Sequence, residues 1–415
     1  MLSPQPLSDP SETREAPRLL AALVTRRLLP SEVPSGQWQG ITETALAQGL
    51  APMLFWAVRS SGMDPESIEN GSAIAASARQ AALADILMEE AVKNVSRAFS
   101  SARIPAVWLK GAALARTVYP QSCLRPMGDL DVLVPFDQRE QALETLFTLG
   151  YELDTRSILP QVDPAVLEKR KGRDEVYAKK LCVHHFVLKG GRSDKVLLEL
   201  HFGLRCHNNS LLLPEKHMQG FFQHTRSLLL DDQTSITVLL PEAHLPYLAV
   251  HSIVQHGGEG ASLMRDLDMH LLITKNDLHW PAVIHQAAAL GWTGAVYRAL
   301  ERAVESFATP VPPWVLEELV HRRPDHEDPF MIEKRHSPGY RWVVARNTLA
   351  RLPVREKMRF IAERLFPYAD FMRARYAVPQ DRAVWPYYPY RWFDQGRVIG
   401  HAIARRIRAP KGKKP

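Results

Sequence analysis

Apolar and polar positions follow two different periods along this chain. Apolar residues recur at helical spacing in 18–29, 41–62 and 72–99, and Ser72 stands where it can cap the last of these helices. From residue 104 the pattern changes to short β-type runs separated by turns, and after residue 240 helical spacing returns. The chain is therefore predicted to place a mixed strand-and-helix segment between two helical regions.

The middle segment is predicted to be a compact unit with a mixed sheet. Its expected strands cover 104–111, 129–135 and 151–154, with short helices between them. A charged helical stretch then leads to a predicted antiparallel hairpin, in which a GGRSD turn joins 181–191 to 195–202. We predict an α+β fold, in which a mixed β-sheet core is flanked by N-terminal and C-terminal helical regions.

This pattern divides the chain into four parts. They are an N-terminal helical region at 15–103, an α/β core at 104–206, a C-terminal helical domain at 240–375, and an aromatic, proline-rich segment with a basic tail at 376–415.

Two aspartates stand one residue apart in the run LRPMGDLDVLVP. Because alternate residues of a strand point to the same side, the carboxylates of Asp129 and Asp131 share one face. Two like charges held together resist burial unless a cation lies between them. Oxygen ligands of this kind suit Mg²⁺. The alternative is a solvated turn acid followed by an exposed edge-strand acid.

A third acid lies in the run VLLELHFGL. Glu199 shares a strand face with His201, whereas the other face is strongly apolar. An acid inside such a strand is unusual without a partner. A salt bridge is one explanation, and a place beside Asp129 and Asp131 on the neighbouring strand is the other. His201, two residues beyond the acid, is the best candidate for a functional histidine.

The run WLKGAAL is predicted to end a strand and to begin a helix at once. The first helical N–H groups point outward at such a junction, and Gly111 would let an anion approach the backbone. The junction therefore favours phosphate binding.

The order and spacing of these runs resemble the order and spacing of the motifs in a known protein family. They look like the bacterial uncharacterised nucleotidyltransferase-like family, within the polymerase-beta-type nucleotidyltransferase superfamily. The resemblance covers residues 95–375 and rests on LKGAALARTVYP, RPMGDLDVLVP, LLELHFGL, HSIVQHGG and LMRDLDMHLL.

The resemblance implies a nucleotidyltransferase that uses an NTP and a hydroxyl-bearing acceptor, which can be a small molecule, a sugar or a protein. Gly111 and Lys110 would meet phosphate, Asp129 and Asp131 would ligate two Mg²⁺ ions, and Glu199 would be the third acid. Mn²⁺ is an alternative to Mg²⁺.

Such a centre can act as a metal clamp on an in-line displacement, with Glu199 as ligand or proton acceptor. Arg125 could then neutralise phosphate charge, and a surface arginine is the alternative. His201 joins it as a candidate substrate contact.

Two other functions remain open. A glycosyltransferase could use Asp129 and Asp131 to hold the diphosphate of a nucleotide sugar through a metal ion. A catalytically silent binding module could keep the fold alone, because the run Lys110-Gly111-Ala112 lacks the hydroxyl of the Gly-Ser pair usual at this turn. The helix with Arg265, written RDLD, is expected to carry an Arg–Asp network on its surface or to contact substrate.

Amino-acid composition indicates which broad class of protein the chain belongs to and where it is expected to be located. The chain has 415 residues, of which 46% are hydrophobic and 23% charged, as in ordinary globular proteins. No apolar run reaches the roughly 18 residues of a membrane span, and the N-terminus lacks the pattern of a secretory signal. The 3 cysteines have no paired spacing. These features predict a cytoplasmic protein.

Positive charge is concentrated at the C-terminal end. The net charge of +7 equals the charge of the tail at 397–415, which has basic residues and no acid. The rest of the chain is balanced, so the sequence has no specific nucleic-acid signature. The tail also forms an amphipathic pattern, which favours contact with an anionic membrane surface or docking as a helix with a solvated end.

Overall fold

The computed structural model describes residues 12–34, 36–154, 185–190, 196–204, 215–255, 262–322 and scattered positions within 354–393. Several features predicted from the sequence lie outside these residues. They are the charged helix at 164–180 and the basic tail at 397–415.

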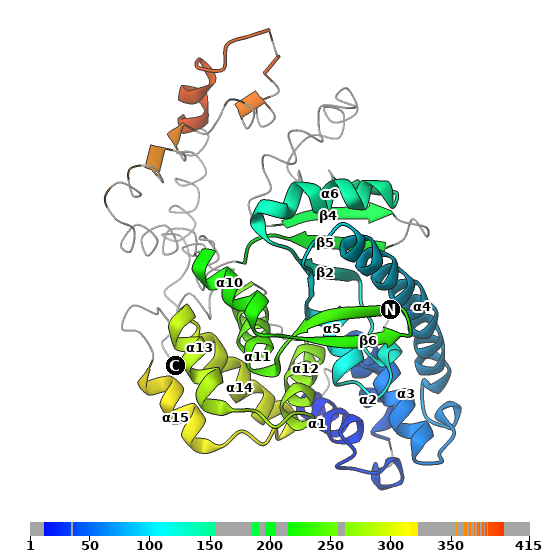
Figure 1. The fold of residues 1–415 in the computed structure, drawn as a ribbon. Helices are drawn as coiled ribbons and strands as arrows, with labels where there is room; N and C mark the ends of the chain where they lie inside the picture. Colours follow the sequence, from blue (N-terminus) through cyan, green and yellow to red (C-terminus); the bar gives the residue numbers. More distant parts are fainter. Residues whose placement is uncertain are drawn as a thin grey trace, which may run out of the picture.

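A seven-stranded mixed sheet forms the centre of the described chain (Figure 1). Its strand order is β3-β4-β5-β2-β1-β7-β6. The pairs β2–β5 and β1–β7 are parallel, and the other neighbours are antiparallel. This architecture confirms the predicted α+β class with a mixed sheet. The strands are β1 (Val107–Trp108), β2 (Asp129–Leu133), β3 (Tyr151–Leu153), β4 (His185–Gly190), β5 (Val196–His201), β6 (Thr225–Asp231) and β7 (Thr234–Leu239).

Helices account for most of the remaining described chain. None of them is long and apolar enough to cross a lipid bilayer. They are α1 (Glu12–Val24), α2 (Trp38–Ala47), α3 (Ala51–Ser60), α4 (Gly71–Ser101), α5 (Lys110–Thr117), α6 (Arg139–Thr148), α10 (Glu215–Gln223), α11 (Pro241–Val250), α12 (Leu263–Thr274), α13 (Trp280–Leu290), α14 (Thr293–Phe307) and α15 (Pro313–His321).

The single helix predicted over 41–62 is wrong, because the structure has two helices there. Gly49 adopts a left-handed φ of 73° directly after α2, a conformation that glycine reaches without steric cost. Pro52 then stands in the first turn of α3, where its missing N–H costs nothing. The two residue types together end one helix and start the next.

Each face of the sheet packs against a different group of helices. Leu130, Val132, Leu198 and Leu200 form a core with residues of α4 and α6. Residues of α1 to α3 and of α11 to α15 form a second core, which Leu133 joins from the opposite face of β2. In Figure 1, strands β4, β5 and β2 lie between α6 above and the group α11 to α15 below. Helices α1 to α3, which precede the sheet in sequence, thus share one core with α11 to α15, which follow it.

The sheet continues beyond the segment in which strands were predicted. Strands β6 and β7 form an antiparallel hairpin, and β7 pairs in parallel with β1 through Val107 opposite Thr237 and Trp108 opposite Val238. No strands were predicted for 225–239. The structure therefore adds two strands between the predicted core at 104–206 and the C-terminal helices.

Adjacent leucines of β5 test the pairing register. Leu198 is fully buried, whereas Leu197 on the opposite face is 37% exposed. We expect Leu198→Ala to lower the free energy of unfolding by about 2–5 kcal/mol, because it leaves a cavity in the core. Leu197→Ala should cost about 1 kcal/mol or less. Urea unfolding followed by circular dichroism measures both, and equal losses would contradict the register.

Candidate active site

The parallel pairing of β2 with β5 brings two of the three predicted acids together. Asp131 lies opposite Glu199, and Leu133 lies opposite His201. Ligand atoms of Asp131, Glu199 and His201 all lie within 4.8 Å of one another. Asp129 is half-buried at the start of β2 and lies outside this group of three. The strand of Glu199 therefore lies beside the strand of Asp129 and Asp131, which is the condition for a shared carboxylate cluster.

His201 contacts both carboxylates through one ring nitrogen. Its Nε2 lies 2.8 Å from Asp131 Oδ1 and 3.2 Å from Glu199 Oε2. His201 and Asp131 are buried, with 6% and 2% of their surface exposed, whereas the Glu199 side chain is 24% exposed. The group thus has a buried end at Asp131 and a more open end at Glu199.

Lys110 brings a positive charge to the same carboxylates from the first residue of α5. Its Nζ lies 2.6 Å from Asp131 Oδ1 and 3.7 Å from Glu199 Oε2. The backbone of Lys110 has a φ of 45°, which is uncommon for a residue with a side chain. Leu109 N–H donates to the backbone carbonyl of Asp131 and fixes this corner beside β2. Unusual backbone conformations of this kind are common at functional sites.

The charges of the group shift its pKa values in opposite directions. Burial raises the pKa of Asp131, but Lys110 and the hydrogen bond with His201 outweigh it, so the net pKa lies below the usual value. Asp129 has a raised pKa, because burial, Asp131 and Glu199 all oppose its negative charge. Asp131 is consequently the more firmly ionised aspartate, and Asp129 is the stronger base.

The remaining shifts stabilise positive charge on the two basic partners. Burial lowers the pKa of His201, but its hydrogen bonds to Asp131 and Glu199 raise it overall. Burial also opposes the charge of Lys110, and Tyr247, Asp131 and Glu199 together hold its pKa above the ordinary value. The buried carboxylate is thereby neutralised within the protein.

Arg125 is not the surface arginine of the alternative interpretation, and its predicted contact with phosphate stays a prediction. Its Nε and Nη2 donate to the two oxygens of Asp268 in α12, at 2.8 and 2.7 Å, and its side chain is 13% exposed. Tyr119 Oη donates to the same carboxylate at 2.7 Å. The ion pair ties the loop before β2 to the C-terminal helices.

Gly111 is required by close packing in this region. A Cβ on Gly111 would collide with Arg125 Nη1 and lie 2.9 Å from Cγ and Sδ of Met127. Glycine therefore lets the guanidinium of Arg125 pass over the first turn of α5. A contact of Gly111 with phosphate stays a prediction, since these side chains cover the position in the structure.

Two acids of α12 are buried, so the expected Arg–Asp network on its surface is wrong. Asp266 is paired with Arg302 of α14 at 2.9 Å, and Asp268 is paired with Arg125. Both acids are at most 5% exposed. The RDLD pattern alone could not reveal partners that are distant in sequence.

Tyr247 in α11 was not among the predicted site residues. Its ring lies between those of His244 and His251, with centroid distances of 6.4 and 6.5 Å. Burial raises the pKa of Tyr247, and its electrostatic neighbours include Lys110 and Asp131. A tyrosine at this position in an apolar helix gives no sequence signal of its own.

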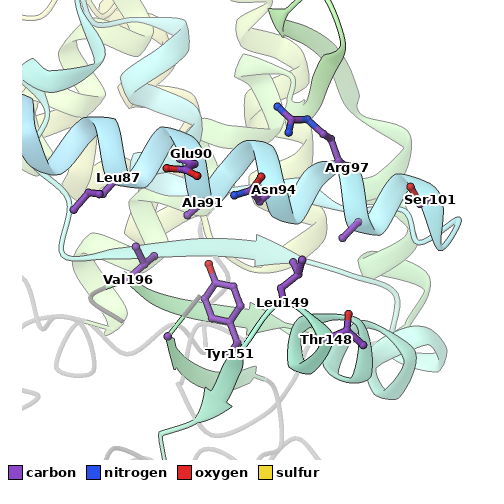
Figure 2. Close-up of a pocket in the computed structure, with 12 residues that line it drawn as sticks. Leu87, Glu90, Ala91, Asn94, Arg97, Ser101, Thr148, Leu149, Tyr151 and Val196 are labelled. Atoms are coloured by element: carbon purple, nitrogen blue, oxygen red, sulfur yellow. The ribbon is translucent and has the colours of Figure 1, made fainter. Parts of the chain in front are cut away.

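A pocket of about 400 Å³ lies away from this group (Figure 2). Figure 2 shows Glu90, Asn94 and Arg97 of α4 across from Tyr151. Val196 also lines the pocket, and strand alternation places it on the face of β5 opposite to Glu199. The pocket therefore does not belong to the candidate active site.

The chain belongs to a family of uncharacterised nucleotidyltransferases, whose family model matches residues 34–308. This match includes the sheet from β1 to β7 and the helices α2 to α14, and so contains every candidate site residue. No curated protein matches the chain. The family resemblance inferred from the motifs is confirmed.

The buried pair of Arg125 and Asp268 can be tested by truncation. Asp268→Ala should lower the free energy of unfolding by about 3–5 kcal/mol, because it leaves the charge of Arg125 buried without its partner. Glu301→Ala removes the half-exposed partner of Arg298 and should cost about 1 kcal/mol or less. Urea unfolding compares the two variants, and equal costs would argue against a structural role for Asp268.

Proposed function

We propose that this protein transfers a nucleotidyl group from an NTP to a hydroxyl-bearing acceptor, with the help of a divalent cation. The observation that carries the proposal is the convergence of Asp131, Glu199 and His201 on neighbouring strands, beside Lys110. The family match supports the reaction class. The acceptor class, the preferred base and the dependence on Mg²⁺ are part of the proposal.

The donor atoms of the site fit a divalent cation. Asp131 and Glu199 offer carboxylate oxygens, and these carboxylates already hold a cation in the form of the Lys110 ammonium. Asp129 adds a third carboxylate on the same strand face as Asp131. When bound, the cation would neutralise phosphate charge and activate the attacking hydroxyl.

Each residue then has a distinct task. Asp131, with its lowered pKa, remains ionised and holds positive charge at the buried end of the site. Lys110 supplies an ammonium that can bind phosphate oxygens of the NTP. Glu199 and Asp129 are the candidate proton acceptors for the attacking hydroxyl, and the raised pKa of Asp129 makes it the better base of the aspartates.

Arg125 and Gly111 shape the side of the site next to α5. Arg125 remains paired with Asp268 and adds positive potential near the expected phosphates without leaving that partner. Gly111 lets this guanidinium lie close to the first turn of α5. Substitution of either residue would therefore disturb the first turn of α5, from which the Lys110 side chain reaches the carboxylates.

Removal of the acids should abolish activity. We expect Asp131→Asn and Glu199→Gln to reduce transfer by about a hundredfold or more, because each removes a carboxylate that would hold the cation that neutralises phosphate charge. Labelling of cell-extract fractions with α-³²P-labelled NTPs measures transfer to any acceptor that the fractions contain. Circular dichroism checks that each variant is folded.

Asp137→Asn is the matched control, since Asp137 is an exposed acid shortly after β2. It should leave transfer unchanged. Undiminished transfer by both site variants would refute the assigned roles. Calorimetry with the four NTPs, with and without Mg²⁺ or Mn²⁺, distinguishes the enzyme from the catalytically silent binding module. A wild-type protein that shows no metal-dependent nucleotide binding would support the silent module.

A further inference from the structure

His201 lies where an additional ligand of a metal ion would lie. A single ring nitrogen, Nε2, faces Asp131 Oδ1 at 2.8 Å and Glu199 Oε2 at 3.2 Å. The imidazole is buried beside β2, and its position is fixed by the pairing of β5, since Val134 N–H donates to the carbonyl of His201 at 2.8 Å. The nitrogen is thus held in place by the sheet.

The spacing of these atoms matches an octahedral ion. A small divalent cation binds its ligands at about 2.1 Å, so neighbouring ligands of an octahedron are separated by about 3.0 Å. The two separations in the structure, 2.8 and 3.2 Å, lie on either side of this value. An ion could therefore replace the hydrogen bonds of His201 with little movement of the strands.

Lys110 marks the region where a cation is attracted. Its ammonium shares Asp131 Oδ1 with His201, so two donors already converge on one oxygen. A divalent ion bound to that oxygen would compete with the Lys110 ammonium. The side chain of Lys110 comes from a different element, α5, so its displacement would require no change in the pairing of β2 with β5.

We propose that His201 is a metal ligand together with Asp131 and Glu199, and that this centre prefers a first-row transition metal such as Mn²⁺ over Mg²⁺. Imidazole nitrogen favours transition metals, whereas Mg²⁺ is bound mainly by oxygen. A role of this ion in catalysis rests on the proposed function. Its binding to His201 is a separate property of the site.

Pulsed electron paramagnetic resonance of bound Mn²⁺ tests the proposal directly. The wild-type protein should show modulation from a coordinated ¹⁴N nucleus, and ¹⁵N-histidine labelling should change that signal to the ¹⁵N pattern. His201→Gln should lose the nitrogen signal and weaken Mn²⁺ binding by about tenfold or more, as expected for a disrupted ligand set. Mg²⁺ at the same concentration as Mn²⁺ should not displace the bound Mn²⁺.

His224→Gln is the matched control, because His224 is an exposed histidine outside the site. It should keep the nitrogen signal and the affinity of the wild-type protein. Mn²⁺ that binds without nitrogen coupling, or that is displaced by an equal concentration of Mg²⁺, would overturn the inference and point to a metal site made of carboxylates alone. No Mn²⁺ binding, with or without an NTP, would overturn both this inference and the metal dependence in the proposed function. The labelled wild-type protein gives an answer even if the His201 variant does not fold.

Discussion

Asp131 carries a buried negative charge in the middle of the sheet, and the candidate site depends on how that charge is compensated. Removing a carboxylate from water is costly unless positive partners and hydrogen bonds replace the lost hydration. Lys110 and His201 both reach its Oδ1, and the backbone of Asp131 is held between β1 and β5. The proposed cation would take over this compensation and release the Lys110 ammonium for phosphate.

The helical regions contribute to the site as well as to stability. The loop before β2 is tied to α12 by the ion pair of Arg125 with Asp268, and Tyr119 joins the same carboxylate. From α11, Tyr247 is an electrostatic neighbour of Lys110. The C-terminal helices therefore hold the part of the site next to the first turn of α5, which carries Lys110. The same contacts stabilise both the fold and the site.

Strand alternation predicted which acidic residues share a strand face, but not which strands pair. The period of two placed Asp129 with Asp131 and Glu199 with His201, and the parallel pairing of β2 with β5 brings the two sets together. The general fold class followed from the order of the helical and β-type runs. Local patterns of this kind are reliable because they depend on neighbours in sequence.

Contacts between distant residues could not be predicted in the same way. The left-handed backbone of Lys110 has no signal in its residue type, and the partners of Asp266 and Asp268 come from other elements. The hairpin of β6 and β7 was missed although it extends the sheet. Each of these features depends on packing between segments, which a single sequence does not encode locally.

The proposed activity depends on a cation held between β2 and β5. Anomalous X-ray scattering from crystals grown with Mn²⁺ and a non-hydrolysable NTP analogue tests it most directly. We expect a Mn²⁺ peak that contacts both Asp131 and Glu199, with the Lys110 ammonium moved from Asp131 toward the phosphates. A bound analogue with no peak between these carboxylates, and with Lys110 still on Asp131, would contradict it.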